Sequence, residues 1–153
     1  MSRRLTLLLF LLLVLGGGLA IGYLNLPGAW YAGLAKPPFN PPPWVFPPAW
    51  TTLYVLIAVA GARTWQRDRG GWAMRLWWAA LGLNFAWSPS VFGAHQLALG
   101  MGVIVLLLAA IVAFIATTWR KDRAAALLFV PYAAWVAFAS ALNAALLALN
   151  GHG

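Results

Sequence analysis

The chain has 153 residues, of which 63% are hydrophobic and 8% charged, and its formal net charge is +8. A soluble domain of this size cannot cover such long uncharged runs with polar surface, so the sequence predicts an integral membrane protein. The chain contains no cysteine, which excludes thiol chemistry and cysteine-based metal sites, and its two histidines are too few for a metal cluster. Its basic residues are confined to short clusters, which argues against nucleic-acid binding.

Five segments are long enough for transmembrane helices, which need about 20 apolar residues each. They are expected at about 5–24, 44–65, 72–91, 97–119 and 124–149. The connections after the second helix are very short, so consecutive helices should be antiparallel neighbours. The predicted fold is an all-α integral membrane protein, a five-transmembrane-helix bundle that forms one domain over 1–153 with a single long loop at 25–43.

The first segment permits two interpretations. Its arginine pair, its apolar run and the small residues Gly18 and Ala20 also resemble a cleavable signal peptide. We favour a retained helix, because the apolar run continues through Leu24 and the Gly18-xxx-Gly22 pattern supplies a small-residue packing face.

Charge asymmetry predicts the orientation of the bundle. Cytoplasmic loops carry an excess of lysine and arginine, so the amino terminus is expected in the cytoplasm and the 25–43 loop and carboxyl terminus on the opposite side. Of the lysines and arginines, only Lys36 falls on that opposite side. The nine basic residues on the cytoplasmic side are Arg3, Arg4, Arg63, Arg67, Arg69, Arg75, Arg120, Lys121 and Arg123.

The stretch KPPFNPPPWVFPPAW, at 36–50, joins the long loop to the second helix. Proline fixes φ and lacks an amide donor, so three consecutive prolines predict a stiff entry to a helix that starts near Trp44, with Asn40 as a cap. Pro47 and Pro48 fall in the first turn, where missing amides cost least. The segment is either a rigid connector with interfacial tryptophans or the roof of a binding pocket.

Aromatic and amide side chains in the predicted helices favour the interpretation that this segment roofs a binding pocket. Trp50 and Tyr54 share one face of the second helix at i, i+4, and Asn84 and Trp87 share one face of the third at i, i+3. Ten tryptophans exceed what two interfacial belts require. A flat hydrophobic ligand would suit a cavity with such aromatic walls.

Two asparagines within the predicted spans should face the interior, because an amide in lipid is costly without a partner. Asn84 and Asn143 are therefore expected either to form interhelical hydrogen bonds or to face a ligand. Trp135 and Phe138 lie deeper on the fifth helix, near the centre of the bilayer.

Three stretches resemble the tryptophan-rich sensory protein or translocator protein family, also called the peripheral benzodiazepine receptor family. They are WYAGLAKPPFNPPPWVFPPAWTTLY (30–54), ALGLNFAWSPSVFGAHQLALG (80–100) and LFVPYAAWVAFASALN (128–143). The resemblance implies a five-helix bundle in a bacterial envelope that binds porphyrins such as protoporphyrin IX, haem-like tetrapyrroles, sterols or benzodiazepine-type ligands beneath the first long loop.

The resemblance also implies the residues of the pocket. Trp50 and Trp135 would matter most, because their counterparts are linked to light-dependent porphyrin breakdown, which makes them the candidate catalytic residues. The full set of implied ligand-binding residues is Trp30, Tyr31, Trp50, Tyr54, Asn84, Trp87, Ser88, Trp135, Phe138 and Ala139.

One departure from the animal members concerns sterols. Those members carry a pattern of Leu or Val, then Tyr, then a basic residue near the end of the fifth helix, whereas ASALNAALLALNGHG at 139–153 contains neither tyrosine nor a basic residue. Such patterns are weak evidence. A bacterial-type tetrapyrrole role is favoured over a dedicated cholesterol role, with sterol-like molecules as secondary candidates.

Three functional hypotheses remain: a porphyrin-binding protein with a sensing, regulatory or transport role, a slow light-dependent porphyrin-degrading enzyme, or a ligand-responsive regulator of a partner. Proton-coupled transporters usually place a carboxylate within a span, but the only acids, Asp68 and Asp122, fall in predicted loops. No cofactor, metal or acid–base constellation is expected; porphyrin would be the ligand or substrate.

Two further expectations concern partners. Lys36 would either pair with a porphyrin carboxylate at the mouth of the pocket or act as an interfacial anchor. Gly82-xxx-Ala86, extended by Ala79 and Ala80, gives the third helix a smooth face that permits close helix contact. This face predicts a homodimer; the alternative is packing within the same chain.

Overall fold

The computed structural model describes residues 2–151, and helices account for its regular elements. Each predicted span coincides with a helical segment whose ends differ from the prediction by no more than three residues. In chain order the elements are α1 (Arg3–Leu11), a π-helical turn (Leu12–Gly16), α2 (Gly17–Leu24), α3 (Ala29–Ala32), a 3-10 turn (Pro43–Val45), α4 (Phe46–Asp68), α5 (Trp72–Ser88), a second π-helical turn (Pro89–Gly93), α6 (Leu97–Thr118) and α7 (Arg123–Asn150).

Four helical segments are long and apolar enough to cross a membrane: Arg3–Leu24, Pro43–Asp68, Leu97–Thr118 and Arg123–Asn150. Within residues 2–151, α5 is not among them. It has 17 residues and includes Arg75, Asn84 and several tryptophans, which dilute its aliphatic content. The structure thus shows an all-helical membrane protein, and the expected fifth span does not meet this test of length and composition.

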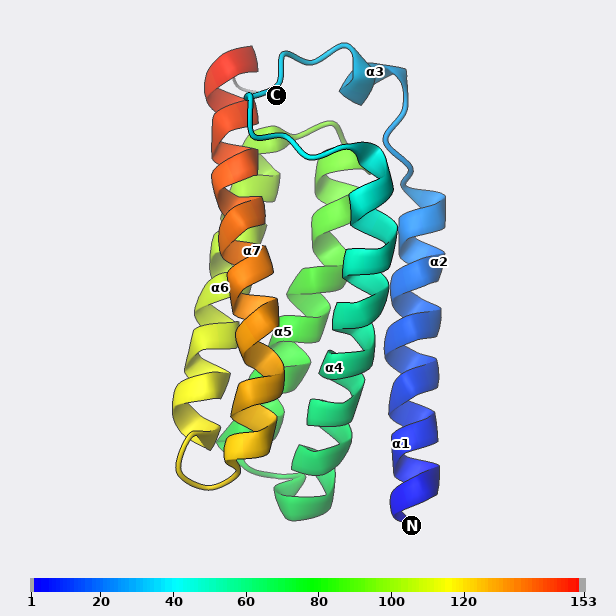
Figure 1. Cartoon of the computed structure of the whole chain (residues 1–153), viewed down its shortest axis with the longest axis vertical. Helices are drawn as coiled ribbons and strands as arrows, with labels where there is room; N and C mark the ends of the chain where they lie inside the picture. The colour runs from blue at the N-terminus through cyan, green and yellow to red at the C-terminus, as the bar shows by residue number, and fades with distance from the viewer. Residues whose placement is uncertain (1, 152–153) are drawn as a thin grey trace.

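The long helical segments stand side by side (Figure 1), and their contacts close into a ring. α4 packs between α1 and α7, α6 packs between α7 and α5, and α5 returns to contact α2 and α4. α1 begins at one end of the bundle and α7 finishes at the other, where the 25–43 loop with α3 crosses the top (Figure 1). This loop is therefore placed above the ends of α4, α5 and α7.

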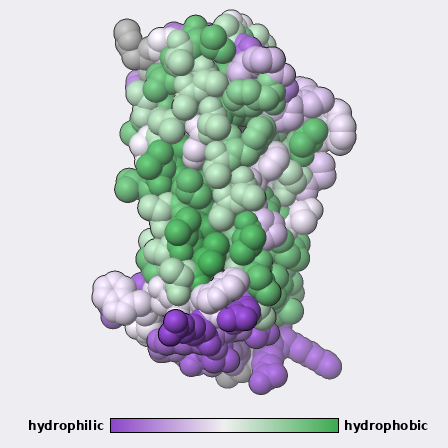
Figure 2. All heavy atoms as spheres, turned by 60° about the vertical axis from the view of Figure 1, so that its left-hand side comes forward, coloured by the Kyte–Doolittle hydropathy of each residue, from purple (hydrophilic) through white to green (hydrophobic). Residues whose placement is uncertain are grey.

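Polarity divides the molecule along its long axis. Figure 2 shows a hydrophobic band over most of the visible face and strongly hydrophilic residues gathered at one end. The nine clustered basic residues belong to this end, because they lie at the start of α1 and around the α4–α5 and α6–α7 turns. We call it the basic end; Lys36 lies in the loop at the other end.

The core at the middle of the bundle is built on close approaches of aromatic rings to small residues. Trp77 is fully buried and donates its Nε1–H to the Ile57 carbonyl at 2.9 Å. A side chain at Gly61 would collide with this indole, so glycine is required there. The first segment joins the same core, since Phe10 packs edge-on against Trp77 at 5.1 Å and Gly18 receives the ring of Tyr54.

Prolines start α4 much as predicted, but the predicted cap is wrong. Asn40 does not cap the helix: its Oδ1 accepts a hydrogen bond from the Tyr31 hydroxyl at 3.4 Å. The 3-10 turn from Pro43 to Val45 precedes α4, and within the described chain no side chain caps either element. The physical reason is that prolines at the start of a helix have no amide hydrogens that a cap would need to satisfy.

Candidate functional site

An aromatic cluster joins α4 to α7 in the half of the bundle below the loop. Trp50 and Trp135 meet edge-to-face with ring centroids 6.3 Å apart, Tyr54 lies 5.6 Å from Trp50, and Phe138 lies 5.6 Å from Trp135. Phe46 adds a further edge contact to Trp135 at 5.9 Å. Four predicted pocket residues on two helices are thus brought into one contiguous cluster.

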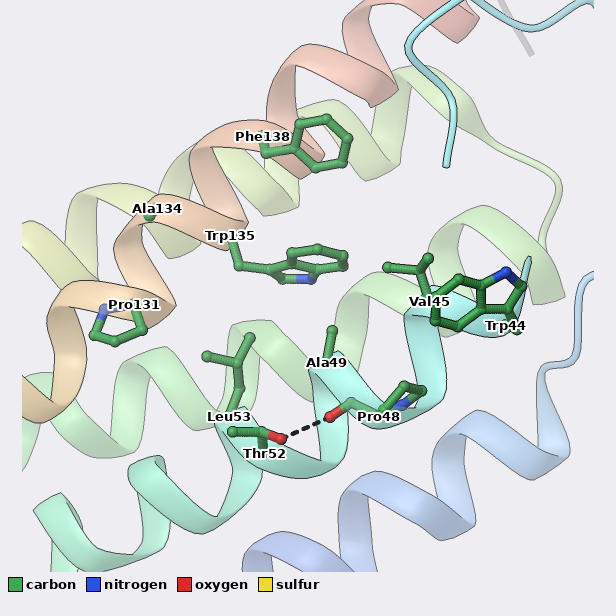
Figure 3. A pocket seen from close by; sticks show the side chains of 10 residues that line it. All are labelled: Trp44, Val45, Pro48, Ala49, Thr52, Leu53, Pro131, Ala134, Trp135 and Phe138. Atoms are coloured by element: carbon green, nitrogen blue, oxygen red, sulfur yellow. Dashed lines mark hydrogen bonds between the residues drawn. The ribbon is translucent and has the colours of Figure 1, made fainter. Parts of the chain in front are cut away.

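A groove of about 680 Å³ opens beside this cluster, on the side of the bundle between α4 and α7. Figure 3 shows Trp135 projecting from α7 across to α4, toward Ala49 and Val45, with Phe138 beside it. Of the ten predicted residues, Trp135 and Phe138 line the groove. Its lining residues are Trp44, Val45, Pro48, Ala49, Thr52, Leu53, Pro131, Ala134, Trp135 and Phe138.

The position of this groove differs from the expected cavity, which was to lie beneath the loop. Pro131, Ala134 and the 73% exposed Trp44 are on the outer surface, so the groove opens sideways. Pro131 lies inside α7, and Pro48 in the first turn of α4; both remove an amide and leave small, flat side chains facing the gap. A ligand would reach this groove from the bilayer.

One polar atom at the groove is buried and unsatisfied. Trp135 Nε1 is inaccessible to solvent and has no hydrogen-bond partner among residues 2–151. A buried indole N–H normally finds an acceptor. Trp135 therefore has an unpaired buried donor at the wall of an almost entirely apolar groove; Trp65 Nε1, outside the groove, is likewise buried and unpaired among the described residues.

The side chain of Asn84 forms an interhelical hydrogen bond. Its Nδ2 donates to the hydroxyl of the fully buried Tyr132 at 2.6 Å, which ties α5 to α7. The sequence reasoning did not single out Tyr132, although its place in the VPY motif before Trp135 was a signal for it. Of the two alternatives for Asn84, the interhelical hydrogen bond is the one observed.

Asn143 likewise connects three helices. Its Oδ1 accepts from Trp87 Nε1 at 3.1 Å and its Nδ2 donates to the Leu97 carbonyl at 3.0 Å. A side chain at Gly100 would meet Asn143 Oδ1 at 3.1 Å, so glycine gives this network its room. Trp87 is thereby fixed at the top of α5, where it also contacts Phe92.

The loop residues of the predicted set form a separate group. Trp30 stacks on His95 with centroids 4.5 Å apart and rings nearly parallel, and Tyr31 makes an edge contact with Phe92 at 5.4 Å. Burial raises the pKa of the Tyr31 hydroxyl, so it remains a hydrogen-bond donor at neutral pH. These contacts place Trp30 and Tyr31 against the turn between α5 and α6, and neither residue lines the groove.

The ammonium group of Lys36 binds backbone carbonyls of its own loop. Its Nζ donates to the carbonyls of Tyr31 at 2.9 Å and Leu34 at 3.1 Å, with Ala32 at 3.4 Å, and lies 4.7 Å from the centre of the Tyr31 ring. An ammonium group has three donors. To pair with a ligand carboxylate, Lys36 would have to give up one of these carbonyls.

The last two predicted residues are small. Ala139 is buried in the main core one turn after Trp135, and Ser88 is half-buried at the last position of α5. Apart from these two, the predicted set divides into the α4–α7 aromatic cluster, the Asn84 and Trp87 hydrogen bonds, and the loop pair. Phe46 and the groove residues of α4 were missed, because their contribution depends on which faces of α4 and α7 meet.

The comparisons with known proteins agree with this architecture. A family model described as TspO/MBR family matches residues 9–149. The chain is similar to the tryptophan-rich sensory protein of Cereibacter sphaeroides, with 36% identity over 98% of this chain and 95% of that protein. It is also similar to Protein CrtK of Rhodobacter capsulatus (40% identity; 86% and 84% covered) and to the translocator protein of Ovis aries (39%; 84% and 79%).

The match covers the loop, the aromatic cluster and the groove, and the relatives span nearly the same length as this chain. With its all-helical membrane bundle and its ten tryptophans, the chain belongs to the TspO/MBR family of membrane sensory and translocator proteins.

Proposed function

We propose that the protein binds porphyrins at the aromatic cluster and groove between α4 and α7, and that it uses this binding for sensing, regulation or transport. A tetrapyrrole is flat and largely apolar, so it fits a wide groove with aromatic and proline walls. The volume of about 680 Å³ lies in the range of small-molecule sites.

The observation that carries this proposal is the contiguous aromatic cluster of Trp50, Trp135 and Phe138 beside the groove, in which the Nε1–H of Trp135 is buried and unpaired. Leaving a buried donor unpaired costs roughly 1–3 kcal/mol. If the indole rotated to present its N–H to the groove, a bound ligand with an acceptor would recover part of this cost. Ring contacts with Trp135 and Phe138 would add the affinity expected from stacking against a flat π-system.

A second candidate function is slow light-dependent porphyrin degradation. It is favoured by the direct contact of two indoles, Trp50 and Trp135, at 6.3 Å. A photo-excited porphyrin against Trp135 would have two neighbouring oxidisable side chains, with dioxygen as the terminal oxidant. In this function the two tryptophans are the catalytic residues.

We also propose a membrane arrangement with α5 as a fifth crossing. α5 continues into the π-helical turn Pro89–Gly93 and runs alongside α6, and an odd number of crossings accounts for α1 starting and α7 ending at opposite ends (Figure 1). The basic end would face the cytoplasm. Impermeant thiol labelling of Phe39→Cys and Arg69→Cys from opposite sides of sealed vesicles tests this orientation.

Titration of the purified protein with protoporphyrin IX, first in the dark and then under illumination, tests the function. Saturable quenching of tryptophan fluorescence in the dark is expected for a binding protein. Loss of the porphyrin absorption bands under light, faster than without protein, would establish the degrading activity as well. Linear, non-saturable quenching would contradict both functions.

A further inference from the structure

A second cavity lies at the basic end, far from the groove and sharing no residue with it. Its volume is about 250 Å³, and it is formed by the last turns of α4 and α6 and the first turn of α5. Its lining is more polar than that of the groove. The lining residues are Thr64, Arg67, Asp68, Gly71, Trp72, Ala73, Thr117, Thr118, Lys121 and Asp122.

Two exposed basic residues, Arg67 and Lys121, line this cavity. Arg67 donates from Nη2 to the backbone carbonyl of Lys121 at 2.6 Å, which holds the guanidinium beside the α6–α7 turn. A guanidinium has five donors, so this bond leaves others free. Because both residues line the cavity, the Arg67 guanidinium and the flexible Lys121 side chain are the two cationic groups available to one anionic group.

The two carboxylates of the cavity are not equivalent. Asp122 is only 7% exposed and accepts two hydrogen bonds from Arg63, at 2.8 and 3.2 Å, so its charge is already compensated. Asp68, by contrast, has no ion-pair partner within the described residues and lies folded against Gly71. The cavity thus presents two cations and one uncompensated carboxylate.

The cavity lies at the level expected for lipid headgroups. Trp72, in its lining, is 70% exposed, and Trp119, at the end of α6, is 40% exposed. Exposed tryptophans at the ends of spans mark the membrane–water interface. Basic pockets between transmembrane helices on this side of a membrane bind phosphate-bearing headgroups.

From these observations we propose that this cavity binds a phosphoethanolamine group, with the phosphate held by Arg67 and Lys121 and the ammonium by Asp68. A phosphate alone would leave Asp68 opposing it, and a cation alone would be repelled by two neighbouring basic residues. A zwitterion satisfies both signs. The volume, on the order of eight water molecules at ~30 Å³ each, admits such a headgroup. The group can come from phosphatidylethanolamine or from a soluble phosphoethanolamine.

Native mass spectrometry of the purified protein tests this proposal. The protein is offered equal amounts of phosphatidylethanolamine, phosphatidylglycerol and phosphatidylcholine with identical acyl chains, and phosphatidylethanolamine is expected to be retained most. Arg67→Gln should lower its retention by about fivefold, as for the loss of one partly exposed ionic contact. Asp68→Asn should lower phosphatidylethanolamine to the level of phosphatidylglycerol without reducing phosphatidylglycerol itself.

Arg69→Gln is the matched control, because it removes the same charge two residues along α4 from a side chain that stacks on Trp65, at 4.9 Å, outside the cavity. Lys121→Gln provides a second variant if Arg67→Gln unfolds. Displacement of the lipid by soluble phosphoethanolamine would identify a soluble ligand; no displacement would identify the membrane lipid. Equal retention of all three lipids, or equal losses from Arg67→Gln and Arg69→Gln, would overturn the proposal.

Discussion

Trp77 and Trp135 differ in how their indole N–H groups are satisfied. Trp77 donates to a backbone carbonyl in the core, whereas Trp135 has a buried N–H with no acceptor among residues 2–151. Unpaired buried donors are rare in native structures and call for an explanation. A structural tryptophan and a ligand-binding tryptophan should therefore respond differently to the same substitution.

Trp135→Phe is expected to weaken protoporphyrin binding by about tenfold, roughly 1.4 kcal/mol, through loss of the free donor and of ring area. The stability of the protein should change little, because no hydrogen bond to the indole is lost. Fluorescence titration in the dark and thermal unfolding measure the two quantities.

Trp77→Phe is the matched comparison. It should destabilise the protein by about 1–3 kcal/mol, since the Ile57 carbonyl would lose its donor in the core. Unaltered porphyrin affinity of the Trp135→Phe protein would argue against a ligand at the groove.

Asp122 makes the stability of the basic end dependent on pH. Hydrogen bonds from Arg63 hold the pKa of the Asp122 carboxyl below its ordinary value, and its side chain also caps the first turn of α7. A carboxyl with a lowered pKa stabilises the fold above its unfolded-state pKa, near 4, and this contribution is lost as the pH falls through the folded value.

The thermal stability of the wild type in detergent should therefore fall as the pH is lowered below about 4. Asp122→Ala should cost about 1–2 kcal/mol at neutral pH through loss of the cap and the ion pair, and should flatten this acid dependence. A variant whose stability falls with acid as steeply as that of the wild type would show that other groups are responsible.

At the scale of elements, the 25–43 loop is held at several points. Asn150, at the end of α7, forms two hydrogen bonds with the backbone of Ala35, both at 2.8 Å. Trp30 stacks on His95, whose backbone adopts a left-handed φ of 56° in the turn before α6. Lys36 binds carbonyls within the loop itself. The loop is therefore a preformed cover whose movement requires specific contacts to break.

Asn150→Ala should release one of these attachments. Hydrogen–deuterium exchange over residues 29–40 is expected to rise, because Ala35 loses both partners, while exchange in α4 and α6 stays unchanged. Leu149→Ala, which alters the exposed neighbour on α7, serves as the control. Equal hydrogen–deuterium exchange of the loop in Asn150→Ala and in the wild type would mean that the Asn150–Ala35 hydrogen bonds do not hold the loop.

Sequence patterns predicted the helices better than the site. Short polar turns and apolar lengths fixed the helix ends within a few residues, and the i, i+4 spacing correctly paired Trp50 with Tyr54. The groove and the Asn84–Tyr132 hydrogen bond depend on which faces of α4, α5 and α7 meet. The local residue pattern of one sequence does not predict how these helices are rotated about their axes. For the same reason Ala80 was wrongly assigned to the outer face of α5: it is 1% exposed and packs in the core.

At the scale of the whole molecule, the small residues on the outer face of α5 predict that the protein forms a dimer. Gly82 is exposed with open space around its α-carbon among the described residues, while Asn84, two positions on, is buried. Ala79 and Ala86 extend this smooth face, which small residues suit for close helix approach in lipid. We propose that two copies of the chain pack through it.

Gly82→Leu should shift the protein toward monomer in detergent while leaving porphyrin affinity nearly unchanged, because the groove lies between α4 and α7. Multi-angle light scattering measures the mass. Gly102→Leu on α6, also at a position with open space around it, is the control. A monomeric wild type, or a Gly82→Leu dimer as stable as the wild type, would contradict dimerisation through α5.

The central claim, that porphyrin binds against the α4–α7 aromatic cluster, is tested most directly by fluorine NMR of protein labelled with 5-fluorotryptophan. A paramagnetic manganese protoporphyrin broadens resonances of nearby indoles, and a zinc protoporphyrin controls for shifts without broadening. The account predicts selective broadening of Trp44, Trp50 and Trp135, with Trp72 and Trp119 at the basic end unaffected. Broadening at Trp72 and Trp119, or none at Trp135, would contradict it.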